Sequence, residues 1–152
     1  NIYPLNELMD KYEKSVGRNA TLILGLTPDP NGLIPTGDEQ RLKEFGTEIN
    51  RRFSSPLAQT SGQKKSLTLK LDKKQPVNYC IIQENIQNGE RIRQYKVEAK
   101  VNGKWQTVCS GESVGHKRIE KFDPVEATAL RLTVLQSIAL PDIINFSAFS
   151  VN

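Results

Sequence analysis

Histidine and cysteine are nearly absent from this sequence, and their scarcity limits the chemistry that the chain can carry. His116 is the only histidine, and Cys80 and Cys109 are the only cysteines among 152 residues. A lone histidine without a recognisable nucleophile and orienting partner argues against a Ser/His/Asp or Cys/His catalytic centre. Two cysteines without a CxxC spacing do not form a zinc site, which takes several ligands at close spacings. We therefore expect no metal and no cofactor.

The two cysteines allow two interpretations. A disulfide between Cys80 and Cys109 is compatible with the sequence, because pairing cannot be deduced from spacing alone. Free cysteines, however, are among the most frequently buried residues and behave as small apolar side chains. We favour the second interpretation.

Long apolar runs are missing as well. No run approaches the ~20 apolar residues that a bilayer span requires, so we expect no membrane partner. Residues 1–54 hold 7 Lys/Arg and 8 Asp/Glu, whereas residues 55–152 hold 14 and 9, so the second half accounts for the formal net charge of +4. Its basic residues alternate with apolar ones and are not interleaved with stacking aromatics, so we expect no nucleic-acid partner.

The first fifty residues predict a helix followed by a buried strand. Apolar residues at helical spacing mark the helix, with Pro4 in its first turn and Gly17 as a left-handed C-terminal cap: Leu5, Leu8, Met9, Tyr12 and Val16. The run from Ala20 to Leu26 then carries apolar residues without alternation. Such a run is typical of a strand in a parallel sheet that is covered on both faces.

A second helix follows the strand. Thr36 and Glu39 have the spacing of a capping box, and an apolar stripe continues from there: Leu42, Phe45, Ile49 and Phe53. A single strand needs a parallel neighbour, and nothing else in this half supplies one. The first half is therefore incomplete by itself.

The periodicity changes after Pro56. Residues 57–65 are polar and predict a linker or loop. From Ser66 onward apolar residues alternate with polar ones, and Asn102-Gly103 is a strong hairpin signal. Seven or eight strands at this spacing predict an antiparallel sandwich.

Two blocks of the sequence resemble one enzyme family. The segment "GRNATLILGLTPDPNGLIPTGDEQRLKEFG" is similar to the end of the catalytic barrel in family 29 α-L-fucosidases, where "GGNLLLNIGPxPDGxIP" precedes a helix. The chain departs from that pattern at Arg18-Asn19, at Gly25-Leu26-Thr27 and at the inserted Pro30-Asn31. The second block resembles the C-terminal β-sandwich of the same enzymes: "IIQENIQNGERIRQYKVEA", "GKWQTVCSGESVGHKRI", "FDPVEATALRLTV" and "INFSAFSV".

The resemblance implies a composite α+β architecture. Residues 1–55 would be the terminal βα piece of a (β/α)8-like barrel, and residues 56–152 an antiparallel, jelly-roll-like β-sandwich of the galactose-binding type. The parent protein would be a retaining α-L-fucosidase, a glycoside hydrolase that removes terminal α-linked L-fucose and meets its substrate in the periplasm or outside the cell. The expected partners are fucosylated glycans and the remainder of the barrel.

The chain itself carries no catalytic residue that the resemblance transfers. The family's carboxylate nucleophile and acid/base lie upstream of the matching segment. Asp29 follows the predicted barrel strand, but a turn residue between two prolines is the favoured interpretation.

Sugar binding by the sandwich is the alternative function, that of a lectin-like module recognising galactose- or fucose-type sugars. Trp105, His116 and Arg118 are its candidate residues, because exposed aromatics stack on pyranose rings and basic groups bind hydroxyl or sulfate oxygens. For Trp105 we favour packing against the sandwich, and for His116 a solvated strand end. Glu84 and Arg91 are expected to pair with each other.

Overall fold

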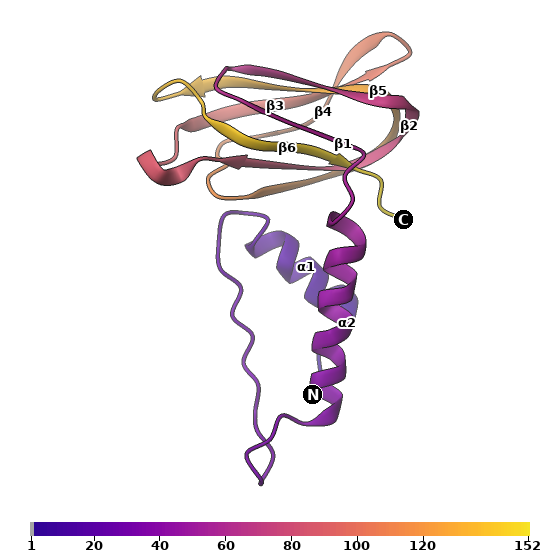
Figure 1. Cartoon of the computed structure of the whole chain (residues 1–152), viewed down its shortest axis with the longest axis vertical. Helices are drawn as coiled ribbons and strands as arrows, with labels where there is room; N and C mark the ends of the chain where they lie inside the picture. Colours follow the sequence, from indigo (N-terminus) through magenta and orange to yellow (C-terminus); the bar gives the residue numbers. More distant parts are fainter. Residues whose placement is uncertain (1) are drawn as a thin grey trace.

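The computed structural model describes residues 2–152, which form a pair of helices below a β-sandwich (Figure 1). The elements follow in the order α1 (Leu5–Ser15), α2 (Thr36–Phe53), β1 (Ala58–Gly62), β2 (Ser66–Glu84), η1 (Ile86–Asn88), β3 (Ile92–Val101), β4 (Lys104–Gly111), β5 (Arg118–Ser137) and β6 (Ile143–Phe149). Neither helix in this described range is long and apolar enough to cross a membrane.

Helix α1 forms where the apolar stripe predicts it, but Gly17 does not act as the expected left-handed cap. The residue with positive φ is Asn19, at 63°. Gly17 is needed for a close approach instead, because a Cβ at this position would lie 2.8 Å from Cβ of Ile119 and also against the carbonyl oxygen of Glu13. The backbone of Gly17 accepts a hydrogen bond from Ile119 N at 2.9 Å. The end of α1 is therefore attached directly to β5.

Helix α2 also forms as predicted, although the capping box does not. Thr36 is already helical, and Pro35 is the N-cap residue without a side-chain capping bond. The carbonyl oxygen of Pro35 accepts from the amides of Asp38 and Glu39 at 2.9 and 3.0 Å. Because the carboxylate of Glu39 pairs with Lys43 one turn later, it does not reach back to the helix start.

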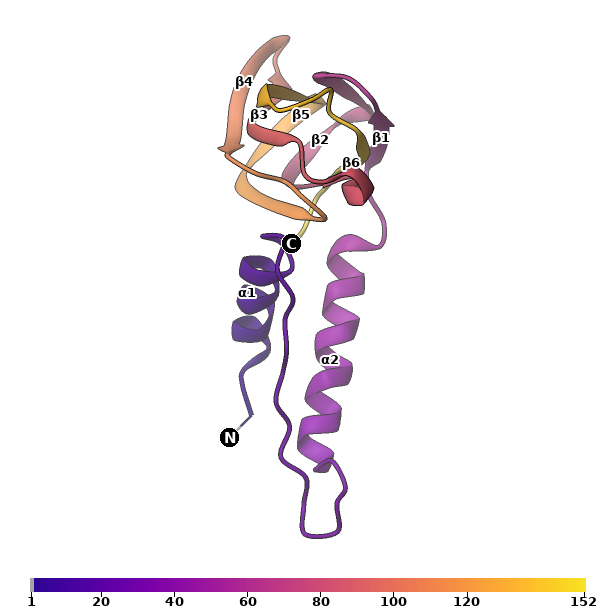
Figure 2. The same cartoon turned by 90° about the vertical axis from the view of Figure 1, so that its left-hand side faces the viewer.

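The predicted strand at residues 20–26 is extended but forms no strand in this chain. A strand requires a hydrogen-bonded neighbour, and no other segment of residues 2–152 pairs with this one as a strand. Figure 2 shows the extended segment lying between α1 and α2, with no strand next to it. The barrel part of the expected architecture is thus not formed by this chain.

The sandwich consists of six antiparallel strands rather than the seven or eight expected. Their order is β1-β6-β2-β5-β3-β4 in one continuous sheet. The count is lower because β2 and β5 are long, with 19 and 20 residues, and change direction at irregular pairing between Lys70 and Gln75. Each of them therefore contributes to both layers. The predicted linker at 57–65 is also corrected, because β1 lies within it and pairs with β6.

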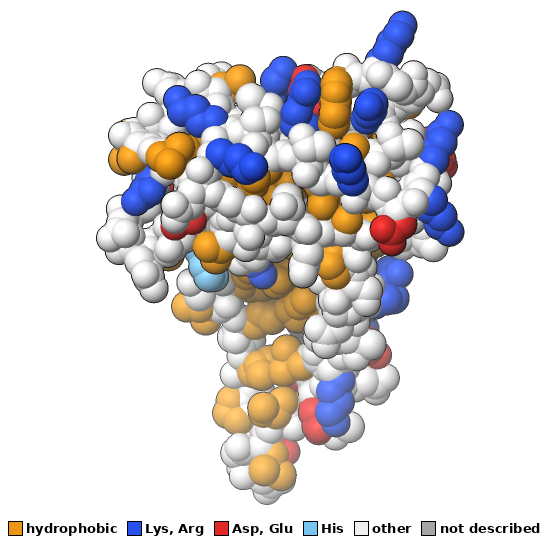
Figure 3. All heavy atoms as spheres, turned by 45° about the horizontal axis from the view of Figure 1, so that its top comes forward, with side chains coloured by type: hydrophobic (Ala, Val, Ile, Leu, Met, Phe, Trp, Pro, Cys, Tyr) orange, Lys and Arg blue, Asp and Glu red, His pale blue; other side chains and the backbone are white. Residues whose placement is uncertain are grey.

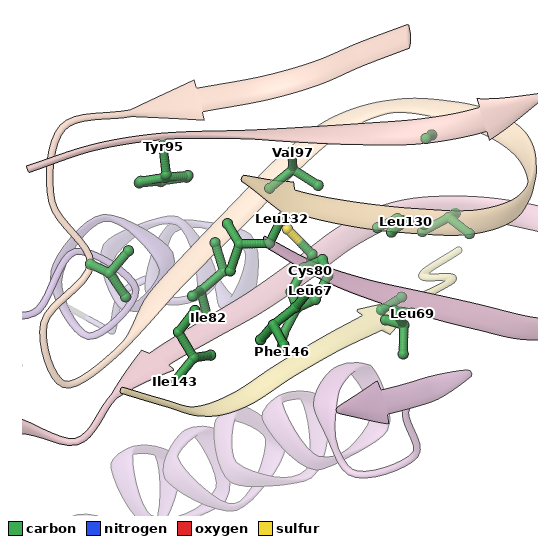
Figure 4. Packing of buried hydrophobic residues seen from close by; sticks show 14 of the residues in the cluster. Leu67, Leu69, Cys80, Ile82, Tyr95, Val97, Leu130, Leu132, Ile143 and Phe146 are labelled. Atoms are coloured by element: carbon green, nitrogen blue, oxygen red, sulfur yellow. The ribbon is translucent and has the colours of Figure 1, made fainter. Parts of the chain in front are cut away.

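The core lies between the two layers (Figure 4). One layer contributes side chains from the second half of β2 and from β6, and the other contributes side chains from β3 and the second half of β5. Among the residues with essentially no exposure are Ile82, Tyr95, Val97, Leu130, Leu132 and Phe146. Helix α2 ends at Phe53 and β1 begins at Ala58; the division into separate units at 1–55 and 56–152 stays a prediction.

We expect Gly17→Ala to lower the free energy of unfolding, because the added methyl group collides with Glu13 and Ile119. Gly46→Ala is the matched control: Gly46 lies inside α2 with nothing within 4 Å of the added Cβ, so this change should stabilise by about 0.5–1 kcal/mol. Urea unfolding of both variants measures the difference. A neutral or stabilising Gly17→Ala would show that the contact between α1 and β5 is not tight.

Candidate functional site

The extended segment after α1 is covered on one side only. Leu22 and Leu24 pack against the cluster formed by Leu8, Met9 and Phe45 of the two helices. Ile23, which points the other way, has 86% of its surface exposed. In an extended chain successive side chains point to opposite sides, so one side is buried under the helices and the other is open.

Several further large apolar side chains are exposed around this segment. We call the set the docking face: Ile2, Tyr3, Ile23, Leu26, Leu33 and Ile34. A cavity of about 500 Å³ lies beside it, lined among others by Leu8 and Leu42 from the helices. Figure 3 shows hydrophobic side chains gathered on the part of the molecule beneath the sandwich. An exposed apolar surface of this kind normally marks a missing partner.

The turn below the docking face is organised by Asp29. Its carboxylate Oδ1 accepts from the backbone amides of Asn31 and Leu33 at 2.8 and 2.9 Å. Its own amide donates to the carbonyl oxygen of Leu33. Asp29 therefore acts as a turn residue, with one carboxylate oxygen used to hold the loop.

The helices are joined to the sandwich by the carboxylate of Glu13 on α1. Arg52 Nη1 of α2 donates to Glu13 Oε1 at 2.9 Å, and the hydroxyl of Tyr79 on β2 donates to the same oxygen at 3.0 Å. Arg52 Nε also donates to Glu48 at 2.7 Å, and Glu48 accepts from Arg51 as well. Burial and the neighbouring Glu13 carboxylate raise the pKa of Tyr79 to about 12, so its hydroxyl stays a donor at neutral pH.

Aromatic rings fill the space beside this polar group. Phe53 of α2 meets Tyr79 and Phe149 edge to face, with ring centroids 5.5 and 5.6 Å apart. Tyr12 of α1 packs against Phe53 and Phe45. Edge-to-face aromatic pairs add about 0.5–1.5 kcal/mol to what burial alone contributes. The junction is therefore both hydrogen-bonded and packed.

A second connection runs from the end of α1 to a buried acid in the sandwich. Glu120 accepts from Arg118 Nε at 2.8 Å and from the hydroxyl of Tyr95. Nη2 of Arg18 lies 3.7 Å from Oε2 of the same carboxylate. Burial, together with the bond to Glu120, raises the pKa of Tyr95 well above its ordinary value. Asn19 adds a contact by accepting from His116 N at 2.7 Å.

Glu84 holds backbone amides of three residues, a structural role that the sequence did not reveal. Its side chain, with the residue only 1% exposed, accepts from the backbone amides of Arg91, Ile92 and Gly115 at 2.8–3.0 Å. The expected pairing with Arg91 thus occurs through the backbone, while the guanidinium of Arg91 donates to Leu140 O. A lone acid at the end of an apolar strand is the only signal in the sequence for this arrangement.

Trp105 lies on the outer surface of β4. The guanidinium carbon of Arg131 is 4.2 Å from its ring centroid, and Lys100 Nζ is 5.9 Å away. The expected packing of Trp105 is thus against cationic side chains on the outside of the sheet rather than in the core.

The three sugar-binding candidates do not form one site. Trp105 pairs with Lys100 beside the β3–β4 hairpin, whereas His116 lies in the loop after the other end of β4. The guanidinium of Arg118 is held by Glu120. Sugar binding by Trp105, His116 and Arg118 stays a prediction.

No group of His, Cys, Asp or Glu within residues 2–152 is arranged to hold a metal ion. Both cysteines are free, and Cys80 is fully buried. The hydrogen bond with Cys109, together with burial, raises the pKa of the Cys80 thiol, so the thiol stays protonated and unreactive.

Comparison with known proteins identifies relatives for the whole chain. An F5/8 type C domain matches residues 37–145. Alpha-L-fucosidase 1 of Arabidopsis thaliana is 32% identical over 168 residues, which cover 86% of this chain and 33% of the plant protein.

Solved structures extend the comparison. A Bacteroides thetaiotaomicron protein whose name assigns it to the alpha-L-fucosidases is 86% identical, with a TM-score of 0.98 over 99% of this chain and 35% of that protein. A GH29 fucosidase of Ruminococcus gnavus, solved in complex with fucose, is 28% identical, with a TM-score of 0.87 over 99% of this chain and 37% of that protein. This chain thus spans about a third of the length of its relatives. The resemblance to family 29 α-L-fucosidases found in the sequence is confirmed.

The junction predicts a pH-dependent stability that Glu48 controls. Hydrogen bonds from Arg51 and Arg52 lower the pKa of Glu48 from 4.5 to about 2. A depressed carboxyl pKa stabilises the fold above the unfolded-state value, and this contribution is lost as the pH falls from 4.5 toward 2. We expect Glu48→Gln to lower stability at pH 7 and to flatten its decline across that window, as measured by urea unfolding at several pH values. Glu7→Gln, on the exposed side of α1, is the control; equal profiles for both variants would contradict the assignment.

Proposed function

We propose that this chain, which belongs to the F5/8 type C domain family, is the non-catalytic C-terminal portion of a retaining α-L-fucosidase and braces its catalytic barrel. The parent hydrolyses terminal α-linked L-fucose from glycans. In this arrangement residues 20–26 are a barrel strand, and α1 and α2 are barrel helices. The sandwich holds the helices in position from outside.

The docking face is the observation that carries this proposal. Ile23 is exposed while its neighbours Leu22 and Leu24 are covered by helices. A barrel strand needs apolar side chains on both sides, because helices cover its outer side and the barrel interior covers its inner side. A free-standing lectin has no use for an extended apolar segment without a strand partner.

The parent's chemistry belongs to the part of the protein outside this chain. Retaining glycosidases need two carboxyl groups roughly 5 Å apart, one as nucleophile and one as acid/base. Asp29, which follows the extended segment along the chain, already uses its carboxylate to hold a turn. We therefore assign no catalytic residue to this chain.

We also propose that the parent works outside the cytoplasm, in a periplasm or an extracellular space. The support is the substrate class, because glycans that carry terminal fucose are met there. A native gene without an export signal would count against this location.

The chain of 152 residues should hydrolyse no aryl α-L-fucoside, whereas the full-length parent should. The reason is that the carboxyl pair lies outside the chain. Release of nitrophenol from a nitrophenyl α-L-fucoside, followed by absorbance, measures both proteins under the same conditions. Turnover by the chain that disappears in an Asp29→Asn variant would overturn the proposal.

In the full-length parent, Ile23→Lys should lower both the thermal midpoint and the fucosidase activity. Burying an isoleucine side chain contributes about 1.5–3 kcal/mol, and a lysine at this position would carry a charge into the barrel. Ile138→Lys is the matched control, because Ile138 is 69% exposed on the sandwich, away from the docking face.

The isolated chain offers a complementary measurement. It should bind a hydrophobic dye or self-associate, and Ile23→Lys should reduce both effects. A wild-type chain that runs as a clean monomer in light scattering and binds no dye would mean that residues 1–53 bury their own apolar surface.

A further inference from the structure

The outer surface of the layer away from the helices carries an ordered array of basic and hydroxyl side chains. Strand pairing aligns β2, β5, β3 and β4 in rows across this surface. One row is Lys70, Ala129, Lys100 and Trp105; the next is Thr68, Arg131, Glu98 and Thr107; the third is Ser66, Thr133, Lys96 and Ser110. The residues between these positions, such as Leu69, Leu130 and Val97, point into the core. We call this twelve-residue surface the basic face.

The single carboxylate of the basic face lies beneath its cations. Glu98 is only 7% exposed, although it belongs to the outer rows. Arg131 donates to Glu98 Oε2 through Nε and Nη2 at 2.9 and 2.7 Å, and Lys96 Nζ donates to Oε1 at 2.9 Å. The negative charge is therefore used to hold Arg131 and Lys96 in place. Lys70 and Lys100 have no salt-bridge partner among residues 2–152.

Further lysines surround the face. Lys64 and Lys65 precede the start of β2. Lys73 and Lys74, in the middle of β2, and Lys104, at the start of β4, lie near the end of the face that carries Lys70 and Lys100. Figure 3 shows Lys and Arg side chains distributed over this surface, which faces away from the helices and the docking face. A barrel bound at the docking face would therefore leave it open.

We propose that the basic face binds an acidic polysaccharide, one that carries sulfate or carboxylate groups along a chain of sugar rings. Lys70 and Lys100 lie two strands apart in one row, roughly 10 Å, and successive rows are roughly 7 Å apart, so these two cations and those of the next rows can contact one extended polyanion. Ser66, Thr68, Thr107, Ser110 and Thr133 supply hydroxyls that donate to and accept from sugar hydroxyls. Trp105 adds an amphipathic ring at the edge of the array.

Other polyanions fit the same surface less well. Single-stranded nucleic acid is bound by several aromatics on which successive bases stack, and the face has only Trp105. Membrane surfaces favour exposed apolar side chains among the basic ones. None of the twelve residues of the face is an exposed large apolar one; Leu135 lies just beyond it on β5, and Ile138 and Leu140 lie in the β5–β6 loop. A flat face of lysines and hydroxyls matches an acidic glycan best.

Binding of the full-length parent to immobilised heparin and to polygalacturonate tests the proposal, with dextran as the neutral probe. We expect binding to both acidic probes at about 0.15 M salt, weakening as salt screens the charges, and no binding to dextran. Lys70→Gln/Lys100→Gln should raise the heparin Kd about tenfold or more, because the two lost contacts with anionic groups together are worth about that factor at an exposed, screened surface. Lys14→Gln/Lys43→Gln removes the same charge from the helices and should change the Kd less than about twofold.

The measurement separates this site from the proposed fucosidase function, because binding does not depend on turnover of an aryl fucoside. An unchanged thermal midpoint in both double variants verifies that the fold is intact. The proposal is overturned by no binding to either acidic probe, by equal weakening in the control variant, or by binding only to single-stranded DNA or phosphatidylserine vesicles.

Discussion

The carboxylate of Glu13 is the interaction on which the relative position of helices and sandwich depends. It is the one acceptor shared by α2, through Arg52, and by β2, through Tyr79. Because Glu13 itself belongs to α1, three elements distant in sequence meet at a single oxygen. Glu13 is half-buried, and removing its carboxylate would leave both Arg52 and Tyr79 without this acceptor. The aromatic rings of Tyr12, Phe53 and Phe149 exclude water around it.

This junction explains how the helical half keeps a defined shape although its extended segment has no strand partner. Helices α1 and α2 contact each other through a small apolar cluster around Leu8, Met9 and Phe45. Their fixed position against Tyr79, Ile81 and Phe149 provides the remaining order. The extended segment between them is then covered only on the side that faces the helices, through Leu22 and Leu24. A rigid support on one side and an open apolar surface on the other is what the proposed bracing role requires.

Much of this fold follows from patterns in the sequence, and the failures have local physical reasons. Helical spacing and strand alternation identified both helices and the core strands, because each depends only on which face is apolar. The missed features depend on contacts between distant residues. Gly17 was expected to be a cap because it follows the predicted helix. Its real constraint is Ile119, far away in the sequence, which packs so close that no side chain fits at position 17. The strand count failed because β2 and β5 each continue through an irregular pairing, whereas turn residues such as Pro76 and Pro124 would be expected to end a strand.

The candidate sites were harder to predict for a related reason. A sequence shows that lysines and hydroxyl residues alternate with apolar ones, but it does not show the register that aligns Lys70 with Lys100 across Ala129. Register depends on pairing across the whole sheet, and a shift of one residue would send every one of these side chains into the core. The same burial of Leu69, Leu130 and Val97 that holds the sandwich together therefore also aligns the outer rows. The basic face is a consequence of the core, and it does not depend on what covers the docking face.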